Sequence, residues 1–170
     1  MTVGQPELRW EHPSTGAAER AWRKPRGCSS EVSQAIHLSA YQIKLMPLVR
    51  IDIRKGKDST YRQQIGHVVY EALIGVGVPK NDRFQVITEH EEDNFLFDPD
   101  YIGIHRSDDL VIIQIAWNEG RSTEQKKALY KAIADGLHAA VGLRREDVFV
   151  NLIEVKKENW SFGNGEAQLV

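Results

Sequence analysis

The sequence has a single cysteine, Cys28, among its 170 residues, and this scarcity excludes two kinds of covalent or metal stabilisation. One thiol can form no disulfide within the chain and cannot supply a four-thiolate metal site. Long apolar runs are also missing, since none approaches the roughly 18 residues that a membrane-spanning helix needs. The first residues lack the apolar core of about 7–15 residues that marks a secretory signal. We therefore expect a soluble, cytoplasmic protein.

An excess of charge of one sign is missing as well. Lys and Arg total 22, Asp and Glu total 24, and the formal net charge is −2. Proteins that coat nucleic acid normally carry a strongly basic surface, so we expect neither a nucleic-acid nor a membrane partner. Hydrophobic residues make up 41% and charged residues 27% of the chain, which is typical of a globular protein. The length suits one domain of roughly 100–200 residues.

Residues 1–45 lack a sustained hydrophobic periodicity. Proline and glycine interrupt the candidate helices of this segment. We expect residues 1–45 to be a disordered N-terminal extension, which comes from an overextended start or an appended expression sequence. The domain then occupies residues 46–170.

From Met46 onward the hydrophobic pattern is regular and repeats itself. A strand predicted at 48–53, a helix that begins after Asp58 or Ser59 and a strand at 84–88 form the first unit. A strand at 110–117, a helix capped by Ser122 and a strand at 148–155 form the second. The two aligned strand motifs, offset by 62 positions, are Leu48-Val49-x-Ile51-x-Ile53 and Leu110-Val111-x-Ile113-x-Ile115.

This tandem β-α-β repeat predicts an α/β fold with a four-stranded sheet and two helices. The units span about 47–90 and 110–155, and a C-terminal tail follows. The crossover rule makes the strands within each unit parallel. If both helices cover one face, the other face needs a partner, so we expect an oligomer. Four isoleucines are predicted to need that cover, namely Ile51, Ile53, Ile113 and Ile115. A monomeric ferredoxin-like domain, with a similar order of elements, is the alternative.

Several motifs resemble the tautomerase superfamily. Met46-Pro47-Leu48-Val49 resembles the start of such a subunit. The run from Gly120 to Lys126 is similar to the strand-to-helix turn of 4-oxalocrotonate tautomerases, and 162–166 to their C-terminal segment. Residues 78–83 and 160–163 are most similar to the double-length malonate semialdehyde decarboxylase branch. The resemblance covers residues 46–170 and implies the tautomerase fold, a homotrimer and catalysis without cofactor or metal.

The resemblance gives Pro47 the role of general base and acid. A prolyl amine at a chain terminus can move a proton between carbon and oxygen of an enol or keto acid. An apolar pocket lowers the pKa of such an amine towards neutrality. An internal proline cannot act in this way, because its nitrogen is an amide. We therefore predict that Pro47 is the first residue of the mature chain; otherwise it is a strand-start proline without chemistry.

Four further residues receive roles from the same resemblance. Arg121 would bind the substrate carboxylate and stabilise the enolate. Asp82 would assist the proline or orient a water. Trp160 and Phe162 would line the apolar wall of the pocket. Each has a plainer alternative: a solvated arginine, a loop carboxylate in an ion pair, and aromatic rings that cap the core or an interface.

Glu119 departs from the decarboxylase pattern. That branch has a second arginine two positions before the one matched to Arg121. A carboxylate at this place would repel a substrate carboxylate, which argues against decarboxylation of malonate semialdehyde. Arg50, Arg83 or Arg106 are the candidates to replace the missing cation.

These observations predict a cofactor-independent tautomerase that acts on small 2-keto or enol carboxylates. The enzymatic alternative is a decarboxylase or hydratase-like lyase on a small 3-oxo acid such as malonate semialdehyde. The alternative from another class is a non-catalytic oligomeric binding protein, which applies if Pro47 stays internal. The fold alone does not decide between these functions.

Overall fold

A computed structural model describes residues 46–170, so the extension predicted at 1–45 lies outside the described residues. None of the helices in the described part is long and apolar enough to cross a membrane. The elements are β1 (Leu48–Arg54), α1 (Ser59–Gly75), β2 (Phe84–His90), η1 (Glu92–Asn94), β3 (Asp100–Tyr101), β4 (Ile104–His105), β5 (Val111–Asn118), α2 (Thr123–Val141), η2 (Arg145–Asp147), β6 (Val148–Val155) and η3 (Lys157–Asn159).

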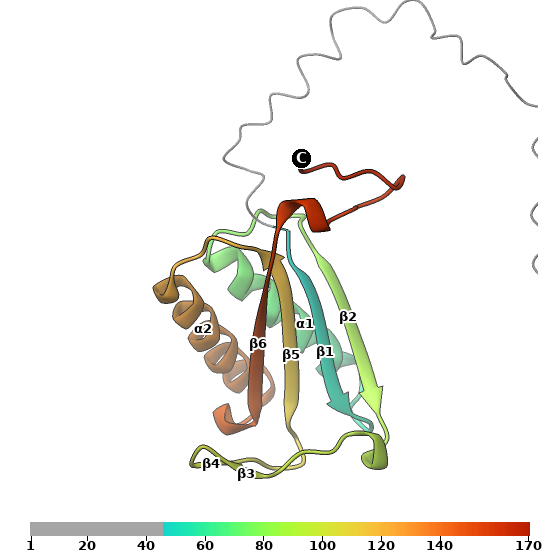
Figure 1. The fold of residues 1–170 in the computed structure, drawn as a ribbon. Helices are drawn as coiled ribbons and strands as arrows, with labels where there is room; N and C mark the ends of the chain where they lie inside the picture. The colour runs from blue at the N-terminus through green and yellow to red at the C-terminus, as the bar shows by residue number, and fades with distance from the viewer. Residues whose placement is uncertain (1–45) are drawn as a thin grey trace, which may run out of the picture. The chain divides into compact units, whose positions relative to one another are not determined.

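Four strands form one mixed sheet in the order β2-β1-β5-β6 (Figure 1). β1 pairs with β2 and β5 pairs with β6 in parallel, whereas β1 and β5 are antiparallel. The predicted α/β fold of two β-α-β units is therefore confirmed. The ferredoxin-like alternative is wrong, because the two strands of each unit are direct neighbours and are not split by a third strand.

Local sequence signals explain where the two helices begin and end. The Asp58 carboxylate accepts a hydrogen bond from the Tyr61 amide at 2.7 Å and caps α1. Ser122 and Gln125 form a complete capping box at the start of α2. α2 ends at Gly142, whose φ of 69° is a conformation that glycine adopts without strain.

Both helices pack on the same face of the sheet, and the core lies between them and the strands (Figure 1). The four isoleucines of the strand motifs are only 0–2% exposed within one chain. The prediction that they need cover from another subunit is therefore wrong, because α1 and α2 already cover them. The alternate residues of the strands form the other face, which we call the open face.

The helices approach each other closely at Gly136. A Cβ atom added there would lie 2.7 Å from Cγ1 of Val68, a β-branched side chain with little freedom to move. We expect Gly136→Ala to lower the free energy of unfolding by about 1–3 kcal/mol. Urea denaturation measures this, with Gly75→Ala as control, since a Cβ at Gly75 meets no atom within 4 Å. Equal stability of the two variants would contradict the close packing.

Candidate active site

The strand register brings the predicted site residues to one end of the sheet. Leu48, directly after Pro47, pairs with Phe84 at the start of β2 and with Ala116 near the end of β5. Asp82 immediately precedes β2, and so lies at the same end as Pro47.

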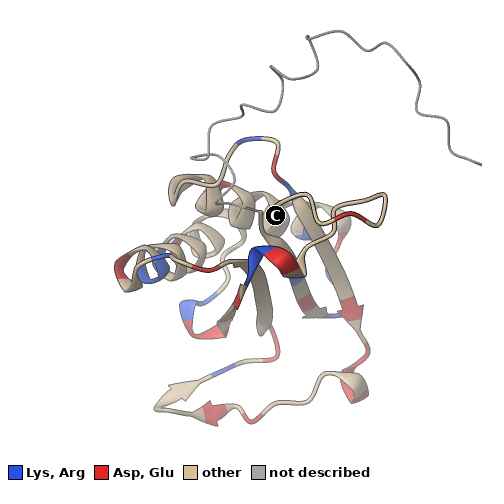
Figure 2. Cartoon of the chain, turned by 45° about the horizontal axis from the view of Figure 1, so that its top comes forward, with Lys and Arg blue, Asp and Glu red and all other residues tan. Residues whose placement is uncertain are grey.

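The ends of β5 and β6 add the remaining predicted residues. Asn118 pairs with Val155 where both strands end. Arg121 follows β5 after a turn, and Trp160 and Phe162 follow β6 after η3. Figure 2 brings this end of the sheet forward and shows the C-terminal tail lying over it. Four separate segments that carry predicted site residues therefore converge at this end of the sheet.

A pocket of about 220 Å³ opens beside Pro47 at this end. The rings of Trp160 and Phe162 stack in one wall, with centroids 5.5 Å apart and planes 11° from parallel. Pro47 itself is buried. The lining residues are Met46, Pro47, Leu48, Phe84, Trp160, Ser161 and Phe162. These surroundings are largely apolar, which disfavours a charged amine.

The sequence analysis missed two residues that shape this pocket. Phe84 was predicted only as a strand residue, and its parallel pairing with Leu48 places it in the wall. Gln168 holds the tail: its Oε1 accepts from the Phe162 amide at 3.0 Å, and its Nε2 donates to the Gly163 carbonyl at 2.7 Å. No local motif in the tail indicated these two hydrogen bonds, because they join residues across a loop.

Arg121 is half-buried at the turn between β5 and α2. Its guanidinium lies over the Trp117 ring, 3.9 Å from the centroid, and Nη1 donates to the Asn118 carbonyl at 2.6 Å. Burial lowers the pKa of Arg121 to about 10, while the negative charges of Glu154 and Asp82 oppose that shift. The predicted alternative of a solvated arginine does not describe this side chain.

Asp82 is half-buried near Arg121. Burial raises the pKa of Asp82 to about 6, and the positive charge of Arg121 limits the rise. Within residues 46–170, its Oδ1 is buried and accepts no hydrogen bond. Arg83, the next residue in the chain, donates to Gln85 at 2.9 Å and lies over the Tyr70 ring. Asp82 and Arg121 thus form a charged pair of groups, while Pro47, Trp160 and Phe162 form the apolar pocket.

The raised pKa of Asp82 predicts a pH-dependent stability effect. Folding favours the protonated form of the Asp82 carboxyl. The contribution of this group to the free energy of unfolding is therefore fully present below about pH 3.8 and is lost as the pH rises through about 6. We therefore expect Asp82→Asn to raise the melting temperature at pH 7–8 and to leave it nearly unchanged near pH 4. Thermal unfolding monitored by circular dichroism measures this, and the exposed Asp93→Asn serves as control. The same gain in melting temperature at both pH values would contradict the raised pKa of Asp82.

Of the three arginines suggested to replace the cation absent at Glu119, none lines the pocket beside Pro47. Arg83 is held against Tyr70, beside α1. Arg106 lines a different pocket, beside the starts of β5 and β6 and thus at the opposite end of the sheet. Arg50 shares the open face with Leu48, which lines the pocket, and is exposed.

Metal ligands do not gather in the described part of the chain, where no three His, Cys, Asp or Glu side chains are placed to hold an ion. Charged groups at the site end include the Asp82 carboxyl, the Arg121 guanidinium and the Lys126–Glu154 ion pair, which spans 2.8 Å. Lys126 lowers the pKa of Glu154 through this hydrogen bond. The arrangement can hold an anion beside an apolar pocket and can exchange a proton through Asp82.

Comparison with known proteins identifies the family. Profiles described as tautomerase enzyme match residues 47–104 and 82–163. The chain is 41% identical over 126 residues to the probable tautomerase YusQ of Bacillus subtilis (strain 168), an alignment that covers 74% of this chain and 99% of YusQ. The chain belongs to the tautomerase family. The predicted recognition and the prediction of an isomerase-type enzyme are confirmed.

Solved structures agree with this tautomerase fold. A malonate semialdehyde decarboxylase superposes with a TM-score of 0.67 at 29% identity, and the match covers 72% of this chain and 95% of that one. A fused 4-OT solved as a symmetric trimer shares the fold, with a TM-score of 0.60, 20% identity and coverage of 72% and 97%. The double-length subunit predicted from the repeat is thus an architecture found in this superfamily.

Proposed function

We propose that this tautomerase interconverts the keto and enol forms of small 2-keto carboxylates, with Pro47 as general base and acid. The supporting observation is the buried position of Pro47 against the stacked rings of Trp160 and Phe162. The rings exclude water from the proline, so its amine, once free, stays uncharged and can accept a proton.

In the proposed reaction, the Pro47 nitrogen removes the proton from the enol hydroxyl or from the carbon next to the carbonyl. The same nitrogen returns a proton to the other atom, so that no cofactor is consumed. Arg121 binds the substrate carboxylate and stabilises the negative charge of the enolate. Asp82, next to Arg121 and with a pKa raised to about 6, assists by orienting a water or moving a proton.

The mechanism requires a free amine on Pro47. The tautomerase profile match begins at residue 47, which supports Pro47 as the first residue of the active enzyme. In the 170-residue chain Met46 precedes Pro47 and also lines the pocket. We therefore propose that the active form lacks residues 1–46.

The test is the ketonisation of phenylpyruvate by a chain that begins at Pro47. The intact mass and Edman sequencing of the purified protein establish its N-terminus. We expect the absorbance of the enol to decay faster with enzyme than in buffer alone, with saturation at increasing substrate. A folded chain with a confirmed Pro47 terminus and no acceleration would refute the proposed substrate class.

A second candidate is decarboxylase or hydratase-like activity on a 3-oxo acid. The half-buried Asp82 favours it, because a carboxyl with a pKa near 6 can activate water. The exposed Glu119 opposes it, because no second cation stands two residues before Arg121. We expect this chain to convert malonate semialdehyde to acetaldehyde and carbon dioxide more slowly than it ketonises phenylpyruvate, and a coupled acetaldehyde assay measures the difference.

We also propose that the enzyme is a homotrimer. The sheet is covered by helices on one side only, and four side chains on its open face are exposed by 39–52%. These are Phe84, Val86, Phe149 and Ile153. The exposed apolar surface supports an assembly that buries this face.

A further inference from the structure

The β3–β4 hairpin ends in a turn that its sequence does not favour. Asp100 pairs with His105 and Tyr101 with Ile104, so Ile102 and Gly103 form a two-residue loop. Both have positive φ, 54° and 70°, as a type I′ turn requires. Asn-Gly is the usual sequence for this turn, and a β-branched residue in the left-handed region is strained.

The same isoleucine is also exposed. Ile102 is 78% and the neighbouring Tyr101 61% accessible to solvent, and nothing in residues 46–170 covers them. An isoleucine here therefore combines backbone strain with exposed apolar surface, and neither is compensated within one copy of the chain. Strain that persists at an exposed tip points to a contact made there.

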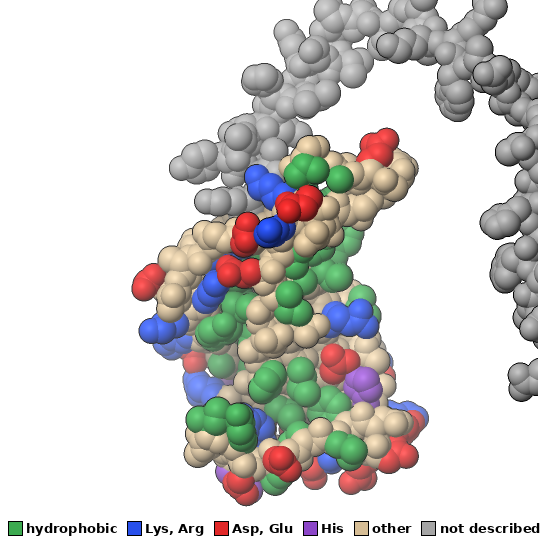
Figure 3. Space-filling model, in the orientation of Figure 1, with side chains coloured by type: hydrophobic (Ala, Val, Ile, Leu, Met, Phe, Trp, Pro, Cys, Tyr) green, Lys and Arg blue, Asp and Glu red, His purple; other side chains and the backbone are tan. Residues whose placement is uncertain are grey.

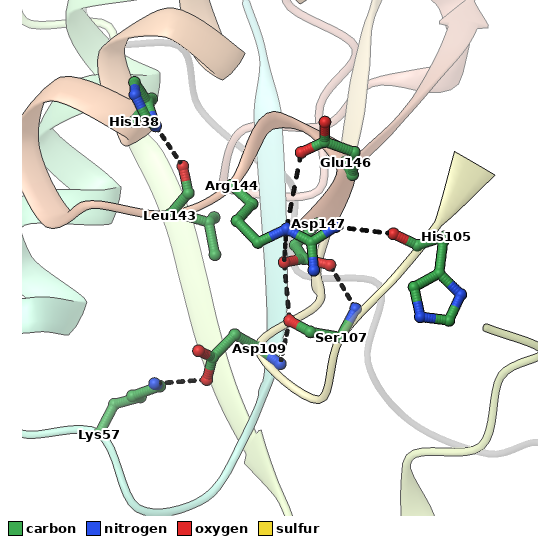
Figure 4. A network of polar contacts seen from close by, with 9 residues as sticks. All are labelled: Lys57, His105, Ser107, Asp109, His138, Leu143, Arg144, Glu146 and Asp147. Carbon is green, nitrogen blue, oxygen red and sulfur yellow. Dashed lines mark hydrogen bonds and ion pairs between the residues drawn. The ribbon is translucent and has the colours of Figure 1, made fainter.

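The base of the hairpin and the segment that follows it are tied to the rest of the molecule by hydrogen bonds and an ion pair (Figure 4). Asp147, fully buried, accepts hydrogen bonds from the Ser107 amide at 2.6 Å and the Ser107 hydroxyl at 2.7 Å. Arg144 donates to the His105 carbonyl at 2.9 Å, and Lys57 binds Asp109 at 2.6 Å. A pre-ordered arm loses little conformational entropy when it docks.

A matching apolar hollow lies on the open face. A pocket of about 250 Å³ is lined by the apolar side chains of Phe97, Leu110, Ile112 and Phe149, together with Tyr101, Arg106 and Asp98. Its volume suffices for a branched aliphatic side chain, since cavities of roughly 150 Å³ accept benzene. Figure 3 shows hydrophobic side chains gathered on this face of the sheet.

The strands of the open face alone offer less area than a standard interface, so an assembly through this face draws on neighbouring surface as well. Four strands of seven or eight residues span roughly 20 Å by 25 Å, or about 500 Å². A stable interface needs about 800 Å² on each partner. The exposed apolar side chains of the hairpin supply further surface of the same chemical kind.

We propose that Ile102 is a docking residue that inserts into the Phe97–Phe149 pocket on the open face of a second copy of this chain. Every copy of the chain carries both Ile102 and the Phe97–Phe149 pocket, so each copy inserts one isoleucine and accepts one. Head-to-tail contacts form a ring when the rotation between copies closes, and a ring of three copies would be the proposed homotrimer. The inference rests on the homotrimer proposed above, but it does not depend on the chemistry of Pro47.

The test is Ile102→Asn in the full chain, measured by sedimentation equilibrium over a range of concentrations. Asn-Gly favours the turn, so each copy should keep or gain thermal stability, while the oligomer loses an apolar contact. We expect a loss of about tenfold in affinity for each contact, hence about a thousandfold for three contacts in a ring. Ile102→Gly, which also accepts positive φ, should dissociate the oligomer in the same way.

Two controls separate the possible outcomes. Val170, also exposed at 77% but outside the hairpin, should tolerate Val170→Asn without a change of mass. Phe149→Ser should weaken assembly, and its effect should not add to that of Ile102→Asn if the two side chains touch. An oligomer that persists in both Ile102 variants overturns the docking role alone. A wild-type monomer overturns the homotrimer as well, whereas tautomerase assays report on Pro47 separately.

Discussion

A chain that begins at Pro47 should ketonise phenylpyruvate about 10²–10⁴ times faster than a chain that keeps Met46, since this is the usual contribution of a general base. Retaining Met46 turns the proline nitrogen into an amide, which has no basic electron pair. The two chains share the pocket wall of Trp160 and Phe162 but differ in Met46, whose side chain lines the same pocket. The comparison therefore tests the free amine together with the removal of Met46, and a substitution of Pro47 itself separates the two effects.

The two chains should be made with defined N-termini and compared by kcat/KM at equal folded concentration. Pro47→Ala in the shorter chain is a further control, because it keeps a terminal amine but replaces the secondary amine by a primary one. We expect its activity to lie between those of the other two. Equal activity of the Pro47 and Met46 chains would exclude the proline mechanism and leave Asp82 as the group to test for proton transfer.

The sequence predicted the elements of this fold because their signals are local. Ser122 and Gln125 form a capping box within one helical turn, and the predicted strand at 148–155 has the observed bounds. The parallel pairing inside each unit followed from the general handedness of crossovers. These features can be predicted without knowing which distant segments of the chain are in contact.

The errors and omissions concern contacts between distant segments. The isoleucines of β1 and β5 were assigned to a subunit interface because an alternating pattern does not say which face the helices cover. The hairpin β3–β4 was missed because its strands have two residues each, too few for a periodic signal. Phe84 entered the pocket only through its pairing with Leu48.

The candidate site shows the same division. Pro47, Arg121, Asp82, Trp160 and Phe162 were named from motifs. They lie in segments that precede or follow the strands, and the pairing of those strands brings the segments to one end of the sheet. The sequence did not indicate that Trp117 stacks under Arg121 or that burial raises the pKa of Asp82. Both effects depend on packing in the folded chain, which no single motif contains.

Replacing Arg121 should remove most of the catalytic activity. We expect Arg121→Met to lower kcat/KM for phenylpyruvate by about 10²–10³, the usual loss when a group that stabilises a developing oxyanion is deleted. The guanidinium is fixed by the Trp117 ring at 3.9 Å and by the Asn118 carbonyl at 2.6 Å, so it is ordered before substrate arrives. A pre-ordered cation contributes more to the transition state than a mobile one.

Arg121→Lys distinguishes charge from geometry. Lysine restores the positive charge but cannot bind a carboxylate through two parallel hydrogen bonds, so it should recover only part of the loss. Arg145→Met is the matched control, because Arg145 precedes β6 at the opposite end of the sheet and binds Asp135 at 2.7 Å. Its kinetics should equal those of the wild type. If Arg121→Met kept full activity with an unchanged melting temperature, the substrate carboxylate would have to bind elsewhere. The exposed Arg50, on the same face of β1 as the lining residue Leu48, would be the next residue to replace.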